Sequence, residues 1–291
     1  MRIAKIKVDP KIIISKPSDG LRWRTRFDFA VSENGKVGLY SSKTKKVVEI
    51  DKCSIALNKI NNSDIFSKKW NGSDRVRVAA SSSDQLNISR GKKTIAGPKK
   101  IREVVGGNFY DISPQSFWQS HTQAPLILSD LVVDFMKLKP GDIVCDLYGG
   151  VGLFTMPISK KIGNDGHVHL VEISSHSVRD AYKIFKDYTN VSIHRGNVDR
   201  KLPKINNIDI IVLDPPRTGA GKEVVNQIIS KKPRAVVYIS CDSASLARDA
   251  KFLQDSGYEL DKINAIDLFP MTHHVECIIR FVPKKKDKLY N

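Results

Sequence analysis

Cys241 lies where a thiol could act as a nucleophile. It follows the apolar run AVVYIS and comes just before SASLARDAKFL, whose apolar residues have helical spacing. Unpaired backbone N–H groups and the positive end of the helix dipole favour a thiolate at a helix N-terminus, and the thiolate is the form that attacks carbon. An isolated free cysteine is more often a small buried apolar residue, so the neighbouring motifs must decide between these interpretations.

A glycine loop and an acidic residue predict a site for an adenosine-containing cofactor. Gly149, Gly150 and Gly152 in DLYGGVGLFT allow the backbone to turn tightly and to approach a ligand. Glu172 ends the next predicted strand, roughly 20 residues further on, where a carboxylate binds the ribose hydroxyls in nucleotide-binding α/β folds. Because the loop lacks the GxGxxG spacing typical of dinucleotide sites, it favours S-adenosylmethionine over NAD.

Two further acidic residues stand at predicted strand ends. Asp214 follows the apolar run IIVL and precedes two prolines, which make a rigid turn, and then Arg217. Glu276 follows a His-His pair and stands just before an apolar strand. Ligands bind beyond the carboxyl ends of strands in doubly wound sheets, so we expect Cys241, Glu172 and Asp214 to lie at one edge. Either of the two acids could instead be a strand-end residue without a role.

The elements that would hold these residues change character near residue 116. Before it, short alternating runs such as RTRFDFAV and RVRVAA are broken by turn-forming segments, which predicts an antiparallel sheet with a helix near 53–69. After it, apolar strands alternate with longer amphipathic segments, a pattern typical of a mostly parallel, doubly wound, Rossmann-like sheet. We expect a smaller α+β domain over residues 1–115 and an α/β catalytic domain over residues 116–291.

The net charge of +17 is concentrated in the first of these domains. Residues 1–112 carry 24 Lys and Arg against 11 Asp and Glu, whereas residues 113–291 carry 24 against 20. In LRWRTRFDF, residues 21–29, three arginines alternate with other side chains, as in a strand with one basic face and one core face. A one-sided basic domain is typical of nucleic-acid binding, although generic surface lysines are the alternative explanation.

Cysteine usage and hydropathy limit the other classes of protein. The four cysteines include no CxxC pair, so neither a zinc site nor a disulfide framework is predicted. No segment approaches the roughly 20 apolar residues that a membrane span requires, and the N-terminus lacks a long apolar run. We therefore expect a soluble cytoplasmic protein with no metal and no membrane association.

Taken together, the motifs resemble those of the RNA 5-methyluridine methyltransferases, the uracil-C5 enzymes that act on tRNA and ribosomal RNA. FWQ, DLYGGVGLFT, VE, DPPRTG, SCD and PMTHHVE occur here in the order and approximate spacing of that family, over roughly residues 20–282. The resemblance implies a class I S-adenosylmethionine-dependent enzyme in which Cys241 is the nucleophile and Glu276 the base. It implies that the following residues line the cofactor site: Gln119, Tyr148, Gly150, Glu172, Asn197 and Asp214.

The sequence also departs from the family pattern. Many members carry an N-terminal oligonucleotide-binding barrel that we do not expect here, and Cys53 is the only cysteine of the N-terminal half, so no iron–sulfur cluster is expected. His121 stands where the family often has asparagine, and Ser243 where proline is common. We expect a monomer that binds tRNA or ribosomal RNA, and the sequence leaves the target uridine open.

Two alternatives remain at this point. A methyltransferase for an adenine nitrogen normally shows NPPY, but Arg217 replaces the aromatic residue, and one for carbon 5 of cytosine typically has a second cysteine near the proline loop. The other alternative is a catalytically silent RNA-binding protein that kept the fold. The presence of both Cys241 and Glu276 argues against it.

Overall fold

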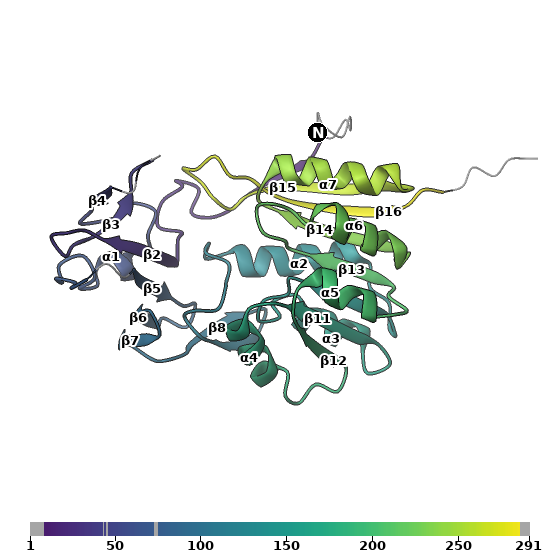
Figure 1. The fold of residues 1–291 in the computed structure, drawn as a ribbon, viewed down its shortest axis with the longest axis horizontal. Coiled ribbons are helices and arrows are strands. Elements are labelled where there is room, and N and C mark those ends of the chain that lie inside the picture. Colours follow the sequence, from purple (N-terminus) through teal and green to yellow (C-terminus); the bar gives the residue numbers. More distant parts are fainter. Residues whose placement is uncertain (1–8, 43, 45, 73–74, 286–291) are drawn as a thin grey trace, which may run out of the picture. The chain divides into compact units, whose positions relative to one another are not determined.

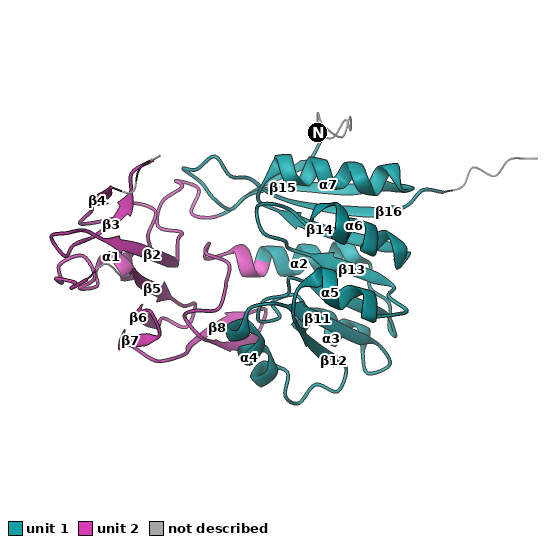
Figure 2. Cartoon of the chain, in the orientation of Figure 1, with its two compact units in different colours: residues 1–15, 127–291 teal, residues 16–126 magenta. Residues whose placement is uncertain are grey.

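The chain forms two compact units in a computed structural model that describes residues 9–42, 44, 46–72 and 75–285 (Figure 1). The larger unit comprises Met1–Ser15 and Ile127–Asn291, and the smaller comprises Lys16–Leu126 (Figure 2). The sequence predicted one change of character near residue 116. In the structure the first described strand belongs to the larger unit, and the smaller unit extends beyond that point to Leu126.

The smaller unit is built on a six-stranded antiparallel sheet with the strand order β4-β3-β2-β5-β6-β7. Its strands are β2 (Arg26–Val31), β3 (Val37–Tyr40), β4 (Val47–Glu49), β5 (Val76–Ala80), β6 (Leu86–Arg90) and β7 (Lys93–Ala96). A hairpin follows, with strands β8 (Ile101–Val105) and β9 (Asn108–Ile112). The antiparallel sheet was predicted, but the predicted helix over 53–69 is reduced to the single turn α1 (Asn58–Asn61).

Alternation in β2 explains how this sheet covers its core. Phe27 and Phe29 are buried, and their rings stack with centroids 5.0 Å apart. The intervening Asp28 is exposed, as period-two alternation requires. The basic segment before β2 keeps the same alternation, but only Arg26 lies in the strand: Arg24 forms isolated bridges and Arg22 has a φ of +54°.

The larger unit is an eight-stranded sheet with the order β1-β15-β16-β14-β13-β10-β11-β12. Neighbouring strands are parallel except where β16 pairs with β14 and β15. The strands are β1 (Lys11–Ile14), β10 (Ile143–Leu147), β11 (His167–Glu172), β12 (Val191–Arg195), β13 (Ile210–Leu213), β14 (Ala235–Ser240), β15 (Tyr258–Asp267) and β16 (Glu276–Pro283). The helices are α2 (Ala124–Met136), α3 (Thr155–Ile162), α4 (Ser175–Ile184), α5 (Val198–Lys201), α6 (Gly221–Ser230) and α7 (Ser243–Asp255), with the 3-10 turn η1 (Leu202–Lys204).

The strand order determines where a ligand can bind. From β10 the chain moves outward through β11 to β12, and it then returns to the other side of β10 as β13 and β14. The order therefore reverses between β10 and β13, and ligands of doubly wound sheets bind beyond the carboxyl ends of the strands at such a point. Strands β13 and β14 are buried along their whole length, as expected for central parallel strands. The predicted Rossmann-like architecture is confirmed.

No helix in the described part of the chain is both long and apolar enough to span a membrane.

Candidate active site

Four of the residues singled out from the sequence stand at the carboxyl ends of neighbouring parallel strands. Tyr148 follows β10, Glu172 ends β11, Asp214 follows β13 and Cys241 follows β14. These strands are adjacent in the sheet in the order β14-β13-β10-β11. The backbone N–H of Asp214 donates to the carbonyl of Leu147 over 3.4 Å, which continues the β10–β13 contact past the last paired residues. The four side chains therefore share one edge of the sheet.

Cys241 and Glu276 stand next to the last residue pair of the β14–β16 ladder. In this antiparallel pair Ile239 is opposite Ile278 and Ser240 is opposite Cys277. The residues next to that pair are Cys241, which follows β14, and Glu276, the first residue of β16. The charge of Glu276 acts on the thiol of Cys241. The thiol and the carboxyl are thus brought together by strand register.

The carboxyl of Glu276 is buried and incompletely bonded. Its residue is 3% exposed, and Oε1 has no hydrogen-bond partner among the described residues. Burial, and then the charge of Asp214, raise the pKa of Glu276 well above its ordinary value. Such a carboxyl is a stronger base than an exposed glutamate once it has lost its proton.

The thiol of Cys241 does not have the low pKa that its place near a helix led us to predict. Burial, followed by the negative charges of Glu276 and Asp214, raises the pKa of Cys241, and Arg217 and a backbone hydrogen bond only partly oppose this. Helix α7 begins after Cys241, and its N-cap Asp242 already accepts the N–H of Ser245 at 2.7 Å. The prediction of a helix-stabilised thiolate is therefore wrong, because desolvation and two carboxylates outweigh the helix terminus.

The glycine loop is tied to the carboxylate of Glu172. The N–H of Gly150 donates to Oε2 at 3.0 Å, and the N–H of Ser174, the N-cap of α4, donates to Oε1 at 2.6 Å. Gly150 has a φ of +57°, and a Cβ added there would meet no atom within 4 Å. At Gly152, with a φ of +94°, an added Cβ would lie 2.3 Å from the ring of Phe185. The loop therefore has open space at Gly150, and this space lies beside a carboxylate whose orientation is fixed by two N–H groups.

Asp146 is a site residue to which the sequence motifs assign no role. It is 1% exposed, Oδ2 accepts from the hydroxyl of Thr155 at 2.6 Å, and Oδ1 has no partner among the described residues. Burial, with a contribution from the charges of Asp214 and Glu172, raises the pKa of Asp146 to about 7. The signal in the sequence is an acid inside the apolar strand IVCDL, where an ionised group needs a reason to be buried.

Asn197 and Tyr148 are two of the cofactor-site residues that the resemblance implies. Asn197 is exposed at the start of α5, and the preceding Gly196 donates to the backbone carbonyl of Glu172 at 2.9 Å, which fixes this turn beside the end of β11. Tyr148 has a φ of +60°, and burial raises its pKa to about 12.

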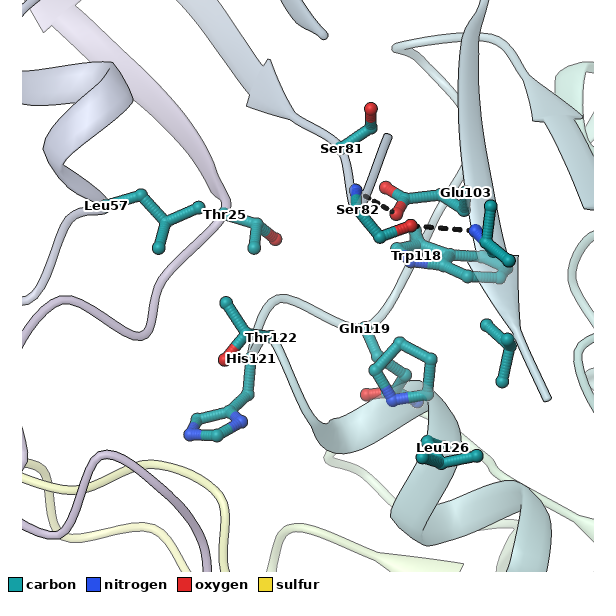
Figure 3. A pocket seen from close by; sticks show the side chains of 13 residues that line it. Thr25, Leu57, Ser81, Ser82, Glu103, Trp118, Gln119, His121, Thr122 and Leu126 are labelled. Carbon is teal, nitrogen blue, oxygen red and sulfur yellow. Dashed lines mark hydrogen bonds between the residues drawn. The ribbon is translucent and has the colours of Figure 1, made fainter. Parts of the chain in front are cut away.

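Gln119 belongs to the smaller unit. It is buried there and lines a pocket of about 90 Å³ with Trp118 and His121, as Figure 3 shows. His121 stacks on Trp23 with centroids 5.5 Å apart, and its Nδ1 accepts the N–H of Gln123 at 3.0 Å. Burial lowers the pKa of His121 to about 4, so its ring is neutral at pH 7.

The loop that follows β13 is fastened to α7 by a buried carboxylate. Asp249, fully buried, accepts the N–H groups of Ala220 at 2.8 Å and of Gly221 at 3.2 Å, where α6 begins. The hydroxyl of Tyr238 donates to the same carboxylate oxygen at 2.7 Å. Because Ala220 has no capping side chain of its own, Asp249 caps α6 from a different helix.

Arg248 completes this clamp. Its guanidinium pairs with the second oxygen of Asp249 at 2.8 Å and donates to the carbonyl of Thr218 at 2.8 Å. Both ends of the loop that carries Asp214 and Arg217 are therefore fixed, one by β13 and the other by α7. Helix α7 therefore holds the proline loop at the edge of the sheet where Cys241 lies, since Cys241 comes just before this helix. Nothing in the local sequence around LARD indicates this long-range role.

Asp249→Asn is expected to destabilise the protein by about 2 to 3 kcal/mol. The substitution removes the charge that faces Arg248 and the N–H groups of α6, and it leaves buried donors without their acceptor. Urea unfolding checks this. Asp255→Asn is the matched control, because Asp255 lies at the exposed end of the same helix and pairs with Lys251 at 2.8 Å. Its loss is expected to change stability by less than about 0.5 kcal/mol, and equal effects of the two substitutions would refute the clamp.

Comparison with known proteins places the chain in a family. The model of the tRNA (uracil-5-)-methyltransferase family matches residues 75–284. An uncharacterized RNA methyltransferase of Streptomyces avermitilis is 34% identical over 294 residues, which cover 91% of this chain and 68% of that protein. One of Corynebacterium glutamicum is 30% identical over 302 residues, covering 97% and 73%. This chain spans only 64% of a third such relative, from Streptomyces coelicolor.

The fold has a close counterpart among solved structures. A crystal structure of the Pyrococcus abyssi tRNA (uracil-54, C5)-methyltransferase in complex with S-adenosyl-L-homocysteine superposes with a TM-score of 0.75. The match covers 97% of this chain and 80% of that one, at 22% sequence identity. The motif-based resemblance is confirmed: the chain is an RNA methyltransferase of the tRNA (uracil-5-)-methyltransferase family.

Proposed function

We propose that this chain methylates carbon 5 of a uridine in tRNA or ribosomal RNA, with S-adenosylmethionine as the methyl donor. One observation carries the proposal: a thiol, Cys241, and a buried carboxyl, Glu276, stand together next to the last pair of the β14–β16 ladder, at the edge of the sheet that bears the glycine loop. A nucleophile and a base at neighbouring positions are what methylation of an electron-poor pyrimidine carbon requires.

Cys241 performs the first covalent step. Carbon 5 of uracil is too electron-poor to take a methyl group directly. When the sulfur of Cys241 bonds to carbon 6, the electrons of the 5,6 double bond move into an enolate, and carbon 5 becomes nucleophilic. S-adenosylmethionine, when bound, supplies the electrophilic methyl group to which carbon 5 forms its new bond, and the bond from the methyl group to the sulfonium sulfur breaks with its electron pair left on the sulfur of S-adenosylhomocysteine. Arg217, whose charge favours the thiolate of Cys241, supports the attack.

Glu276 completes the reaction. After methylation, carbon 5 still carries its original proton, and the bond from sulfur to carbon 6 cannot break until that proton is removed. A carboxylate oxygen of Glu276 takes the proton, the 5,6 double bond forms again, and Cys241 leaves as the thiolate. Oε1, which has no hydrogen-bond partner among the described residues, is available for this task.

The cofactor fits the glycine-loop crevice. The carboxylate of Glu172 is oriented by Gly150 and Ser174, and its remaining lone pairs suit two ribose hydroxyls. Open space at Gly150 and the unpartnered Oδ1 of Asp146 support a polar ligand at this edge. We assign cofactor binding to these residues: Gln119, Tyr148, Gly150, Glu172, Asn197 and Asp214.

We assign RNA binding to the basic N-terminal region, residues 1–115, and catalysis to residues 116–291, in a protein that acts as a monomer. The positive charge of the first region supports this division. Since a stacked or paired uracil cannot reach a nucleophile, the target nucleotide must be turned out of the RNA, which costs about a few kcal/mol that phosphate contacts can offset.

The pH dependence of the reaction follows from the two raised pKa values. Cys241 must lose its proton to attack, and Glu276 must be ionised to act as base, and the pKa of each is raised. Both conditions are met better at higher pH, so log kcat/KM is expected to rise with pH, with a slope that approaches about 2 where both groups are still protonated. Arg217→Ala should move this profile to higher pH, because it removes the charge that lowers the thiol pKa. A flat or falling profile would contradict both assignments.

Methyl transfer to RNA tests the proposed function itself. The protein is incubated with methyl-labelled S-adenosylmethionine and with bulk tRNA or ribosomal RNA lacking 5-methyluridine, and the RNA is digested to nucleosides. The expected result is label in 5-methyluridine alone. Label in methylated adenosine or cytidine would show a different base specificity. If neither RNA takes up label, the result would favour a catalytically silent binding protein.

A further inference from the structure

The sheet of the smaller unit carries arginines on the face that points away from the core residues Phe27 and Val78, and the catalytic assignment does not use them. Strand β2 places Arg26 and Asp28 on this face, and β5 places Arg77 and Ala79 on it. Arg26 is opposite Ala79, and Asp28 is opposite Arg77. The small side chain of Ala79 leaves room beside the guanidinium of Arg26. This face includes part of the arginine alternation that was visible in the sequence.

A cavity of about 310 Å³ lies over this face. One wall is formed by the β2 and β5 side chains with Arg24, and the other comes from residues 114–118 and 120. The wall is fixed to the sheet because the backbone N–H and the hydroxyl of Thr25 both donate to the carbonyl of Ser120, at 2.8 and 2.9 Å. The volume is at the small end of the range for ligand pockets. We call this cavity the Arg26 pocket.

Most of the charged residues that line the Arg26 pocket are arginines. Its lining includes three arginines and one acid, Asp28. Arg26 is 12% exposed and pairs with Oε1 of Glu103 at 2.9 Å, while Nε and Nη1 have no hydrogen-bond partner among the described residues. Glu103 does not supply the missing acceptors: its Oε1 accepts from Nη2 of Arg26, and its other oxygen accepts the N–H of Ser82 at 2.9 Å, as drawn in Figure 3.

An anion at this place would improve the electrostatics of the pocket. Buried N–H groups without acceptors cost free energy, and a guanidinium offers donors whose planar geometry matches phosphate oxygens. Arg77, 36% exposed, is paired only loosely with Asp28, at 3.3 Å, so it can turn toward a phosphate. The exposed ring of Phe117, which also lines the pocket, offers a surface for the attached ribose or base.

We propose that the Arg26 pocket binds a backbone phosphate of the RNA, with Arg77 as the direct contact and Arg26 as the buried charge behind it. The inference rests on the proposed function only in taking RNA as the ligand. A phosphate contact carries no base specificity, so its role is to set the register of the RNA on the protein.

Matched arginine variants test the pocket. Arg75 and Arg77 both pair with Asp28, but only Arg77 lines the cavity. Binding of labelled bulk tRNA is measured by fluorescence anisotropy at several salt concentrations. Arg77→Ala should weaken binding about three- to tenfold and reduce the slope of log K against log salt by about one. Arg75→Ala, which removes one charge outside the cavity, should change the affinity for RNA by less than about twofold.

A variant that is expected to strengthen RNA binding separates the loss of a contact from damage to the fold. Asp28→Asn removes the acid that faces the pocket and should tighten RNA binding about two- to threefold. Equal effects of Arg75→Ala and Arg77→Ala, or an unchanged salt slope in Arg77→Ala, would overturn the proposal. Binding is read without methyl transfer. A protein that binds RNA through Arg77 but does not methylate uridine would therefore refute the proposed function and leave the pocket standing.

Discussion

Replacing Cys241 with alanine is expected to abolish methylation of RNA, with a loss of at least about 10⁴-fold in turnover. Without the sulfur no atom can add to carbon 6, and carbon 5 stays too electron-poor to bond to the methyl group. The side chain is only half-buried, so its removal should cost little stability. Turnover is measured with labelled methyl donor, and cofactor affinity by calorimetry is expected to stay within about twofold.

Cys277→Ala is the matched control for this substitution. Cys277 is another half-buried free thiol, one residue from Glu276 on β16, and burial raises its pKa to about 11. An unspecific effect of losing a thiol near the site would appear in both variants, whereas the nucleophile assignment requires turnover in Cys277→Ala within a few-fold of the unmodified protein. Retained methylation in Cys241→Ala would remove the assignment.

Substituting glutamine for Glu276 is expected to trap the protein on its RNA. The neutral amide keeps the shape of the carboxyl but cannot take the proton from carbon 5, so the bond between Cys241 and carbon 6 persists after methylation. Turnover should fall about 10² to 10⁴-fold, while a band of protein bound to RNA accumulates on denaturing gels. The free protein should not lose stability, because burial at this position already disfavours the charged form of the carboxyl, and glutamine is neutral.

Glu259→Gln serves as the control for the base. Glu259 is an exposed glutamate of the same sheet, on β15 opposite Val282, and is therefore at the other end of β16 from Glu276 and the site. This variant should turn over normally and form no lasting adduct. Slow turnover of Glu276→Gln with only free protein on the gel would assign proton removal to another group.

Much of the site could be predicted because its residues follow strands. Parallel strands end at a common edge, and Glu172, Asp214 and Cys241 each come after an apolar run, so the sequence alone predicts that they are neighbours. The place of Glu276 next to Cys241 could not be derived in this way. It depends on the register between β14 and β16, which no local pattern contains.

The pKa of the thiol shows the limit of local reasoning. The residues adjoining Cys241 in the sequence indicate only a helix terminus, which lowers a thiol pKa. The carboxylates that raise it come from residues 27 and 35 positions away in the sequence, Asp214 and Glu276. The start of the chain gives a similar lesson, because β1 joins the larger sheet beside β15 through a pairing across some 250 residues. Non-local pairing of this kind has no sequence signal of its own.

The most direct test is chemical capture of the bond between the protein and the pyrimidine ring. RNA with 5-fluorouridine in place of uridine carries fluorine on carbon 5, so the last step has no proton to remove. With this RNA and S-adenosylmethionine, mass spectrometry of the digested complex should find a methylated fluorouridine nucleotide on the peptide that contains Cys241, and no adduct without the methyl donor. An adduct on another residue, or none from a preparation that methylates ordinary uridine, would contradict nucleophilic catalysis by Cys241.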